Sequence, residues 1–427
     1  METVRFDKIV PEGKAMGYWQ GRALFAVGPL PGEEARVRVT RRKKDWAEGV
    51  VQEWVETSPR RGEASETHYL SCSPWQAVEY DYQLELKRGM LAEVYARPEL
   101  AAAGLRVGEV MASPQRFGYR NKLEFSLWEA GAKGSGKLEL AFHERGSWKY
   151  LLPAPHGCLL GTEAMNQAAE TVVERVNELD LVGVADTLTV RQSHTHGQVI
   201  TVLLVKDTVE RDWSKLVVPQ VAGVAVVRKL RHDTYETLWQ HGELMLRETV
   251  GGVKLIYPWD SFFQVNLPAF EAALGRVLAE IKPGAQVIDL YGGAGTIGLP
   301  AARVAARVVG VEIVQSSVDL ANRNADINGL TNYRALAIAG EKLDPSVLAG
   351  ADTIIVDPPR AGLHPKVVDM LLAARPERII YLSCNPVTQA RDVTLLLAAY
   401  KPSGPVVGFD FYPGTLHLES LVTLARK

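Results

Sequence analysis

Two side chains of this sequence could carry covalent chemistry. Cys384 follows the apolar residues 378–383, and a lone cysteine in such a run is usually an inert core residue. Here an Asn-Pro pair follows, which would start a helix whose positive end lies beside the sulfur. Glu419 lies in the apolar run 415–424, where periodicity alone favours a solvent-facing carboxylate. Paired with a nucleophile, Glu419 would instead be a general base, and we treat the two residues together.

A glycine-rich turn follows an apolar strand further back in the chain. Residues 287–298 read VIDLYGGAGTIG, and Glu312 closes the next strand. Glycines let a ligand approach the backbone closely, and a carboxylate about twenty residues later could accept hydrogen bonds from ribose hydroxyls. The pattern fits a nicotinamide dinucleotide as well as S-adenosylmethionine. A turn that only packs a helix on a strand is the alternative without a ligand.

Consecutive prolines at the end of a later strand help to decide which of these two cofactors the chain binds. Residues 356–360 read VDPPR. Two prolines hold the backbone rigid and extended, so that a planar group beside them can be held at a defined height. Asp-Pro-Pro in this position resembles the motif of class I methyltransferases that act on planar nucleobases or amides. A Pro-Pro loop without a function is the alternative.

The elements that must position these residues alternate between strand and helix after residue 259. This order predicts a doubly wound, mostly parallel sheet in an α/β domain over residues 259–427. The expected strands are 286–290, 308–312, 333–338, 353–356 and 378–383. The candidate residues follow these strands, at the carboxyl edge where such sheets bind ligands.

The first part of the chain has a different pattern. Short strands broken by glycine and proline predict a small β-barrel of the oligonucleotide-binding kind over residues 1–58, and residues 59–258 predict a mixed α+β middle domain. Six basic residues with no acid among them lie in the barrel: Arg36, Arg38, Arg41, Arg42, Lys43 and Lys44. They are candidates for RNA contact, and a solvated charged hairpin is the alternative.

The composition is that of a globular protein, with 427 residues, 47% hydrophobic and 23% charged residues, and a net charge of −2. The length suggests three domains. No run approaches the roughly 18 uncharged apolar residues of a membrane span, and no secretory signal is visible, so we expect a cytoplasmic protein. Three cysteines are too few for a disulfide framework or a four-thiolate metal site.

Taken in order, the motifs resemble those of the RNA uracil-5-methyltransferase family, which uses S-adenosylmethionine to make 5-methyluridine. The resemblance covers nearly the whole chain, and the barrel resembles a TRAM domain. The motifs are residues 119–122 (YRNK), 261–266 (SFFQVN), 289–292 (DLYG), 357–360 (DPPR), 383–386 (SCNP) and 417–419 (HLE). Each motif is weak alone, and their occurrence in one order is specific.

The resemblance implies a class I methyltransferase fold and a role for each matching residue. Cys384 would be the nucleophile that forms a covalent adduct with uracil, and Glu419 the general base. The residues implied around S-adenosylmethionine are Gln264, Asp289, Tyr291, Gly292, Glu312 and Asp357. The residues implied to contact RNA, besides the six of the barrel, are Arg120, Lys122 and Phe263. Phe263 or its neighbour Phe262 could stack on the base, or either could belong to the core.

The sequence departs from the family at one place, where many members hold an iron–sulfur cluster on four cysteines. Cys72 and Cys158 match two of these cysteines, and the other two positions hold none. His68 could replace one ligand, but the sequence favours a polar histidine on the surface. We therefore predict neither an iron–sulfur cluster nor another metal.

RNA is the implied partner, no membrane contact is expected, and we expect a monomer. The basic barrel favours large-subunit ribosomal RNA over transfer RNA by analogy alone. Three other functions stay open. An amino-group methyltransferase would use Asp-Pro-Pro without Cys384 and Glu419, a nicotinamide-dependent oxidoreductase would share the glycine turn, and a non-catalytic RNA-binding protein would need only the basic cluster.

Overall fold

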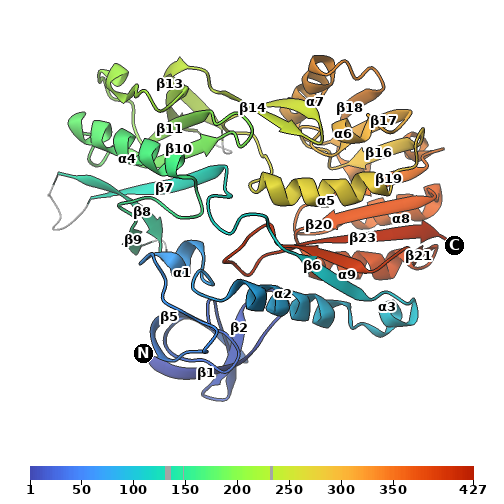
Figure 1. Ribbon diagram of the computed structural model, residues 1–427, viewed down its shortest axis with the longest axis horizontal. Helices are drawn as coiled ribbons and strands as arrows, with labels where there is room; N and C mark the ends of the chain where they lie inside the picture. The colour runs from blue at the N-terminus through green and yellow to red at the C-terminus, as the bar shows by residue number, and fades with distance from the viewer. Residues whose placement is uncertain (130–135, 148, 231–233) are drawn as a thin grey trace.

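A barrel, two larger sheets and a two-stranded hairpin make up the β-structure of the computed structural model, which describes residues 1–129, 136–147, 149–230 and 234–427. Figure 1 shows a small barrel near the amino terminus, a sheet from the middle of the chain and a larger, helix-flanked sheet that contains the carboxyl terminus. The predicted combination of a β-barrel, a mixed middle region and an α/β carboxyl-terminal region is confirmed.

The barrel closes in the strand order β1-β2-β3-β5-β4. Its strands are β1 (Glu2–Ile9), β2 (Ala15–Trp19), β3 (Arg22–Ala26), β4 (Glu34–Arg42) and β5 (Trp46–Glu56). Alternate side chains point into the core, as Val4 and Phe6 of β1 show. The sequence pattern does not predict β2, which contains Gly17. A Cβ at Gly17 would lie 2.1 Å from the Arg5 carbonyl oxygen, so glycine is required where β1 and β2 meet.

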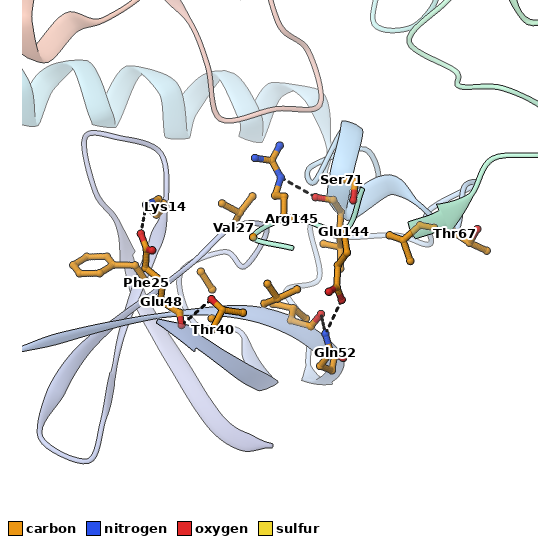
Figure 2. Close-up of a pocket in the computed structure, with 17 residues that line it drawn as sticks. Lys14, Phe25, Val27, Thr40, Glu48, Gln52, Thr67, Ser71, Glu144 and Arg145 are labelled. Atoms are coloured by element: carbon orange, nitrogen blue, oxygen red, sulfur yellow. Dashed lines mark hydrogen bonds and ion pairs between the residues drawn. The ribbon is translucent and has the colours of Figure 1, made fainter. Parts of the chain in front are cut away.

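Charged side chains join the barrel to the rest of the chain. Arg61, just after the barrel, forms a buried bidentate ion pair with Glu33, with N–O distances of 2.7 and 2.9 Å. On the other side, Glu144 accepts a hydrogen bond from Gln52 of β5, as Figure 2 shows, and it pairs with Arg38 of β4. These contacts place the basic strand β4 beside the middle sheet.

The middle sheet has the strand order β13-β12-β11-β10-β7-β8-β9. Its strands are β7 (Lys122–Glu129), β8 (Leu138–His143), β9 (Leu151–Pro153), β10 (Ala185–Gln192), β11 (Val199–Val205), β12 (Gly223–Lys229) and β13 (Tyr235–Gly242). The helices beside it are α1 (Tyr69–Cys72), α4 (Glu163–Glu178) and the 3-10 helix η1 (Trp213–Leu216). Met165, Ala168, Val172 and Val176 repeat at helical spacing on the buried face of α4, which packs on the sheet.

The carboxyl-terminal sheet starts with five parallel strands in the order β18-β17-β16-β19-β20, so the predicted doubly wound arrangement is confirmed. Its strands are β16 (Gln286–Leu290), β17 (Arg307–Glu312), β18 (Tyr333–Ala337), β19 (Thr353–Val356), β20 (Arg378–Ser383), β21 (Tyr400–Pro402), β22 (Val406–Phe409) and β23 (Glu419–Arg426). β23 runs antiparallel between β20 and β22.

Helices precede and connect these strands. They are α5 (Leu267–Ala279), α6 (Gly298–Ala301), α7 (Gln315–Ile327), α8 (Pro365–Ala374) and α9 (Pro386–Leu396), with the 3-10 helices η3 (Gly340–Lys342) and η4 (Pro345–Leu348). Among the described residues, no helix combines the length and the apolar composition that a membrane crossing requires.

Two segments assigned to the middle domain from sequence pack instead with the carboxyl-terminal sheet. They contain α2 (Tyr80–Tyr95), α3 (Pro98–Ala102) and β6 (Val107–Met111), and the hairpin of β14 (Met245–Val250) and β15 (Val253–Pro258). β6 pairs in parallel with β22 at the edge of the sheet, and Asn324 of α7 donates to the Ile256 carbonyl of β15. The sequence assigns both segments to the predicted domain 59–258, whereas their partners in the structure lie after residue 259, because pairing between distant segments leaves no local pattern.

Candidate active site

Cys384 and Glu419 are brought together by the pairing of β20 with β23. Ser383 lies opposite Ser420 in this antiparallel ladder, so the next residue pair is Cys384 and Glu419, at the carboxyl edge of β20. Glu419 is 5% exposed and pairs on its other side with Phe409. β23 is buried along most of its length, so its sequence lacks the alternation of a half-exposed strand. The solvent-facing carboxylate that periodicity alone favours is therefore wrong.

Both groups hold their protons more tightly than they would in water. Burial, followed by the charges of Glu419 and Asp357, raises the pKa of the Cys384 thiol to about 11. Burial also raises the pKa of Glu419 well above its usual range. The positive end of α9 would lower a thiol pKa, but burial and the carboxyl groups outweigh it. Cys384 is therefore a thiol in the free protein at neutral pH.

Asn385 connects the cysteine loop to the Pro-Pro turn. Its side-chain oxygen accepts a hydrogen bond from the Val387 amide and so caps α9. Its side-chain nitrogen donates to the Arg360 carbonyl at 2.8 Å, and the Thr388 hydroxyl donates to the same carbonyl at 3.2 Å. The Asp-Pro-Pro-Arg and Ser-Cys-Asn-Pro motifs, which are separate in sequence, are therefore adjacent in the site.

Buried polar contacts hold the segment that leads into β23. Lys87 of α2 forms a fully buried ion pair with Asp410, with an N–O distance of 2.5 Å, and donates to the Tyr412 carbonyl at 3.1 Å. The Tyr119 hydroxyl donates to the Pro413 carbonyl at 3.2 Å. Two distant parts of the chain therefore fix the point from which β23 starts.

Hydrogen bonds join the segment around Asn121 to the segment around Gln264. The side-chain amide of Asn121 donates to the Gln264 carbonyl at 2.8 Å, and its backbone amide donates to the Val265 carbonyl at 3.0 Å. Asn266 caps α5 and donates to the Phe411 carbonyl at 2.9 Å. The two asparagines thus hold the backbone of Gln264 near the segment that leads into β23.

The glycine-rich turn begins at Tyr291, whose φ is +66°. A bulky residue in this left-handed region is strained, and such strain persists where the surrounding structure enforces it, often at ligand sites. Two residues later, Gly293 donates from its amide to one oxygen of Glu312 at 3.2 Å. The other oxygen of Glu312 accepts from the amides of Ile313 and Val314. The Glu312 carboxylate therefore lies beside the glycine turn.

Asp289 lies beneath this turn. It is buried, and a Cβ at Gly298 or Gly292 would lie 2.7 or 3.1 Å from its Oδ2 atom. Within the described residues, the backbone amide of Gly298 is the polar group that faces its carboxyl oxygens, and no side chain hydrogen-bonds to them. Burial raises the pKa of Asp289, and that of Asp357 after the neighbouring strand β19, to about 7. These carboxyl groups fit a positively charged ligand such as S-adenosylmethionine, which would favour their ionised form.

Two exposed apolar side chains beside the turn escaped the sequence analysis. Ile313 and Val314 directly follow Glu312 at the end of β17, and both are exposed. Large apolar side chains next to a carboxylate of this kind fit a planar base of a nucleoside. Their position after the acidic end of the strand is the signal that could have identified them.

Phe263 is buried, so the prediction that it contacts RNA is wrong. It is 2% exposed and stacks on Tyr257, with ring centroids 4.0 Å apart. Its neighbour Phe262 is 78% exposed and is available for stacking on a base. Packing against β15 decides which of two consecutive phenylalanines lies inside, and the sequence contains no such information.

A basic pocket lies near the start of β23. Arg120, Lys122 and His417 line it together with Arg145, which comes from a loop without a recognisable motif. Burial, followed by the charge of Arg360, lowers the pKa of His417 to about 4, so His417 is neutral at pH 7. Glu124 also lines the pocket and pairs with Lys122 at 3.1 Å. Among the described lining residues, the positive charge that no ion pair offsets therefore comes from Arg120 and Arg145, which suit phosphate groups.

Half of the predicted basic cluster of the barrel is paired with carboxylates. The pairs are Arg36–Glu53, Arg38–Glu144 and Arg41–Glu48. Arg42 lies over the Trp19 ring at 5.3 Å, and Lys43 and Lys44 are exposed near the tip of the β4–β5 hairpin. Of the six basic residues of this cluster, Arg42, Lys43 and Lys44 are therefore the ones whose charge no ion pair within the described residues offsets.

Comparison with known proteins places this geometry in a family. The family model described as tRNA (uracil-5-)-methyltransferase matches residues 79–427. The chain belongs to this family. An uncharacterized RNA methyltransferase of Caldanaerobacter subterraneus subsp. tengcongensis is 30% identical over 454 residues, which cover 100% of this chain and 98% of that protein. A second one, of Nitratidesulfovibrio vulgaris, is 31% identical over 460 residues, which cover 99% and 96%.

A solved structure extends the similarity to the fold of the whole chain. The Pyrococcus abyssi tRNA (uracil-54, C5)-methyltransferase in complex with S-adenosyl-L-homocysteine is 25% identical, with a TM-score of 0.77, and the match covers 99% of this chain and 100% of that one. This member of the tRNA (uracil-5-)-methyltransferase family is therefore an S-adenosylmethionine-dependent RNA methyltransferase. The nicotinamide-dependent oxidoreductase and the non-catalytic RNA-binding protein are excluded.

Proposed function

We propose that this enzyme methylates carbon 5 of a uridine in RNA through a covalent adduct with Cys384. The register of β20 and β23 carries the proposal, because it sets the thiol beside the buried carboxyl group of Glu419. A methyltransferase acting on an amino group needs neither side chain, because a nitrogen lone pair attacks the methyl group directly.

Each residue has a separate step in the proposed reaction. S-adenosylmethionine supplies a methyl group on a positively charged sulfur. Cys384 gives its proton to water, and its sulfur forms a bond to ring carbon 6. The π electrons between carbons 5 and 6 move onto carbon 5 and the neighbouring carbonyl, which makes carbon 5 nucleophilic. Carbon 5 then bonds to the methyl group as the methyl–sulfonium bond breaks. Glu419, whose protonated form is favoured by burial, must first give its own proton to water. Its carboxylate then takes the proton of carbon 5, and the bond between Cys384 and carbon 6 breaks to restore the ring.

The residues proposed to hold the cofactor are Gln264, Asp289, Tyr291, Gly292, Glu312 and Asp357. Glu312 suits ribose hydroxyls because a carboxylate accepts two hydrogen bonds at once, and the exposed Ile313 suits the adenine ring. Asp289 supports the turn from below, where its carboxyl group keeps the two nearest glycines in place.

The target base must leave its stack before Cys384 can reach it, because the ring atoms that react are covered in folded RNA. The exposed ring of Phe262 suits the extruded base or a neighbouring one. Arg120, Lys122 and Arg145, which line the basic pocket, suit the phosphates on either side.

The sequence favours large-subunit ribosomal RNA because of the barrel. The Pyrococcus abyssi enzyme, however, is named for transfer RNA and matches 99% of this chain, so the barrel does not separate the two substrates. Methylation of both purified RNAs with labelled cofactor, followed by mapping of 5-methyluridine, assigns the substrate. A loss of the modified uridine from only one of them in a deletion strain provides the independent check.

A denaturing gel tests the roles of Cys384 and Glu419. Glu419→Gln should transfer the methyl group but fail to release the product, so a slowly migrating, methyl-labelled complex of RNA and protein should accumulate. Cys384→Ala should give no such complex and at least a thousandfold loss of activity, on the order expected for removal of a nucleophile. Glutamine keeps the size of glutamate, so packing changes little.

Cofactor binding provides the control for folding. Both variants should bind S-adenosylmethionine with the affinity of the wild type, as measured by calorimetry. Methylation by Cys384→Ala would contradict the covalent mechanism. Normal turnover by Glu419→Gln would mean that another group removes the proton.

A further inference from the structure

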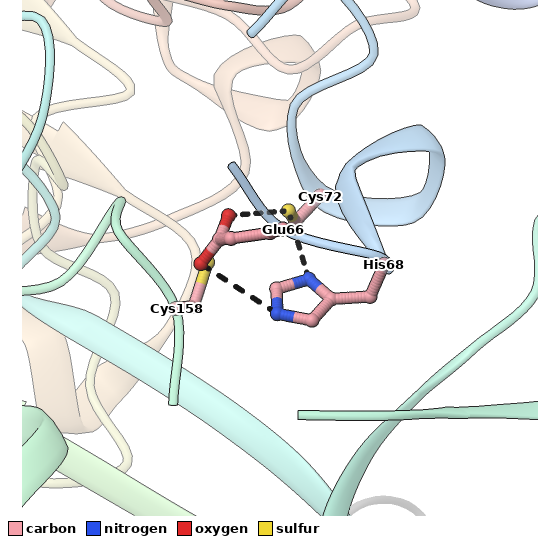
Figure 3. A group of neighbouring side chains, drawn as sticks. All are labelled: Glu66, His68, Cys72 and Cys158. Carbon is pink, nitrogen blue, oxygen red and sulfur yellow. Dashed lines mark hydrogen bonds and ion pairs between the residues drawn. The ribbon is translucent and has the colours of Figure 1, made fainter. Parts of the chain in front are cut away.

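Four side chains with metal-binding atoms meet between α1 and a distant loop. Glu66, His68 and Cys72 come from one short segment and Cys158 from the loop after β9, and Figure 3 shows their side chains pointing toward one another. Their ligand atoms all lie within 4.8 Å of one another. His68 is 3% exposed, so the interpretation of it as a surface histidine is wrong. Polar groups that are buried together need hydrogen-bond partners or a bound ion to offset the cost of removing them from water.

The two ring nitrogens of His68 have different neighbours, a backbone carbonyl and the Cys72 sulfur. Its Nε2 atom lies 3.1 Å from the Gly157 carbonyl oxygen, which can only accept, so Nε2 carries the proton. The lone pair of Nδ1 then faces the Cys72 sulfur at 3.4 Å. A histidine that donates from one nitrogen to a backbone carbonyl and presents the other is the usual arrangement at metal sites.

Neighbouring groups orient the other ligands. The Glu66 carboxylate accepts from the Leu159 amide and from the Gln76 side chain, both at 2.6 Å. Asn166 binds both the amide and the carbonyl of Cys158, each at 3.0 Å. Such outer hydrogen bonds hold metal ligands in place and keep the carboxylate from turning away.

The size and the donor set distinguish a single ion from an iron–sulfur cluster. A tetrahedral zinc with bonds of roughly 2.0–2.3 Å sets its ligands about 3.3–3.8 Å apart. The Cys72 sulfur lies 3.4 Å from Nδ1 of His68 and 3.9 Å from a Glu66 oxygen, and the widest separation within the group is no more than 4.8 Å. An iron–sulfur cluster is normally held by four cysteines, and this site has two. The residues therefore do not fit the cluster that many relatives carry.

We propose that Glu66, His68, Cys72 and Cys158 bind one divalent zinc ion. Two thiolates, an imidazole and a carboxylate are ligands that zinc accepts, and four protein ligands fill a tetrahedral site, as in zinc sites that stabilise structure. The ion would tie residues 66–72 to the loop at Cys158, across about ninety residues of chain. Its role is structural, because no position is left for a substrate.

The location of the site connects the ion to RNA binding. Cys72 and Cys158 line the basic pocket that also contains Arg120 and Lys122. Arg145, on the same wall, donates to the Leu70 carbonyl within α1 at 3.0 Å. By fixing α1 against the loop, the ion would hold the wall of the pocket in position. Loss of the ion should therefore weaken RNA binding without affecting the cofactor.

Metal analysis of the full-length enzyme, purified under reducing conditions with zinc present, tests the proposal. We expect one zinc per chain in the wild type, and at least a hundredfold weaker zinc binding in Cys72→Ser and Cys158→Ser. Cys384→Ser, which changes the third cysteine, should keep its zinc. This comparison does not depend on catalysis, so it can fail while the proposed function stands, and the reverse is also true.

A spectroscopic measurement keeps the test decisive if a cysteine variant fails to fold. Cobalt exchanged into the wild type should show thiolate charge-transfer bands and the absorption of a tetrahedral ion, and Glu66→Gln should shift these bands while leaving one cobalt per chain. Removal of the ion with a chelator should lower the melting temperature and weaken RNA binding at least tenfold, with unchanged binding of S-adenosylmethionine.

Three results would overturn the proposal. The first is wild-type protein that binds no stoichiometric zinc although its thiols are reduced. The second is iron with acid-labile sulfide in place of zinc, which would indicate a cluster. The third is a disulfide between Cys72 and Cys158 in protein prepared with reductant and zinc, which would show that these thiols pair with each other.

Discussion

The thiol of Cys384 is protonated in the free enzyme because burial and the carboxyl groups of Glu419 and Asp357 raise its pKa to about 11. The thiolate is the reactive form, so it makes up on the order of one part in ten thousand of the free enzyme at pH 7. A positive charge on the cofactor near Asp357 would favour the thiolate by offsetting the carboxylates. In the proposed mechanism, binding of the cofactor would therefore raise the fraction of Cys384 that is present as the thiolate.

Alkylation of Cys384 measures this pKa directly. A raised pKa means that the thiolate appears only as the pH rises, so we expect the rate of reaction with iodoacetamide to increase about tenfold per pH unit between pH 7 and 9. Peptide mapping by mass spectrometry measures the alkylated fraction of Cys384 separately from those of Cys72 and Cys158. A rate that reaches a plateau near pH 7 would contradict the raised pKa.

At the scale of elements, the position of β23 depends on the segment before it and thus on α2. The buried Lys87–Asp410 pair joins these elements, with the Tyr412 carbonyl as a further acceptor for the lysine. α2 also packs on β6, which completes the same sheet. A helix distant in sequence from the catalytic domain therefore contributes to the placement of Glu419.

Breaking this ion pair should destabilise the enzyme strongly. Lys87→Met leaves the Asp410 carboxylate buried without its charged partner, and we expect a loss of about 3–5 kcal/mol in the free energy of unfolding. Lys8→Met, at the exposed Lys8–Glu93 pair, is the matched control and should lose about 1 kcal/mol or less. Urea denaturation measures both. A similar small loss for both variants would show that the buried pair is not needed.

At the scale of the whole molecule, the basic residues proposed to contact RNA lie in two places, the barrel and the basic pocket, which are far apart in sequence. The buried Arg61–Glu33 pair and the contacts of Glu144 attach the barrel to the middle sheet, whose basic pocket lies near the start of β23. The barrel and the pocket can therefore act on one RNA molecule, with the barrel adding affinity and the pocket directing the base.

The tip of the barrel hairpin provides a test of this arrangement. Lys43→Ala combined with Lys44→Ala should lower the slope of log K for RNA binding against log salt concentration by about one to two, because each lost phosphate contact removes the release of counterions. Arg36→Ala should change the slope less, since its guanidinium already pairs with Glu53. Binding of S-adenosylmethionine by both variants checks their folding. An unchanged slope in the lysine variant would show that the tip of the hairpin does not contact RNA.

The sequence by itself determined the parts of this enzyme whose signals are local. The glycine turn, the five parallel strands and the motifs at Asp357 and Cys384 could all be identified, because turn residues and the periodicity of buried strands depend on neighbours within a few residues. The basic cluster of the barrel was also found as a pattern, although ion pairs with distant acids offset half of it.

The tertiary structure alone decided the orientation of single side chains and the pairing of distant segments. Glu419 points inward because β23 lies between two strands, Phe263 is buried because it packs on Tyr257, and His68 is buried because the loop at Cys158 covers it. β6 joins a sheet whose other strands come from the far end of the chain. Each of these features results from contacts between residues far apart in sequence, which no local pattern encodes.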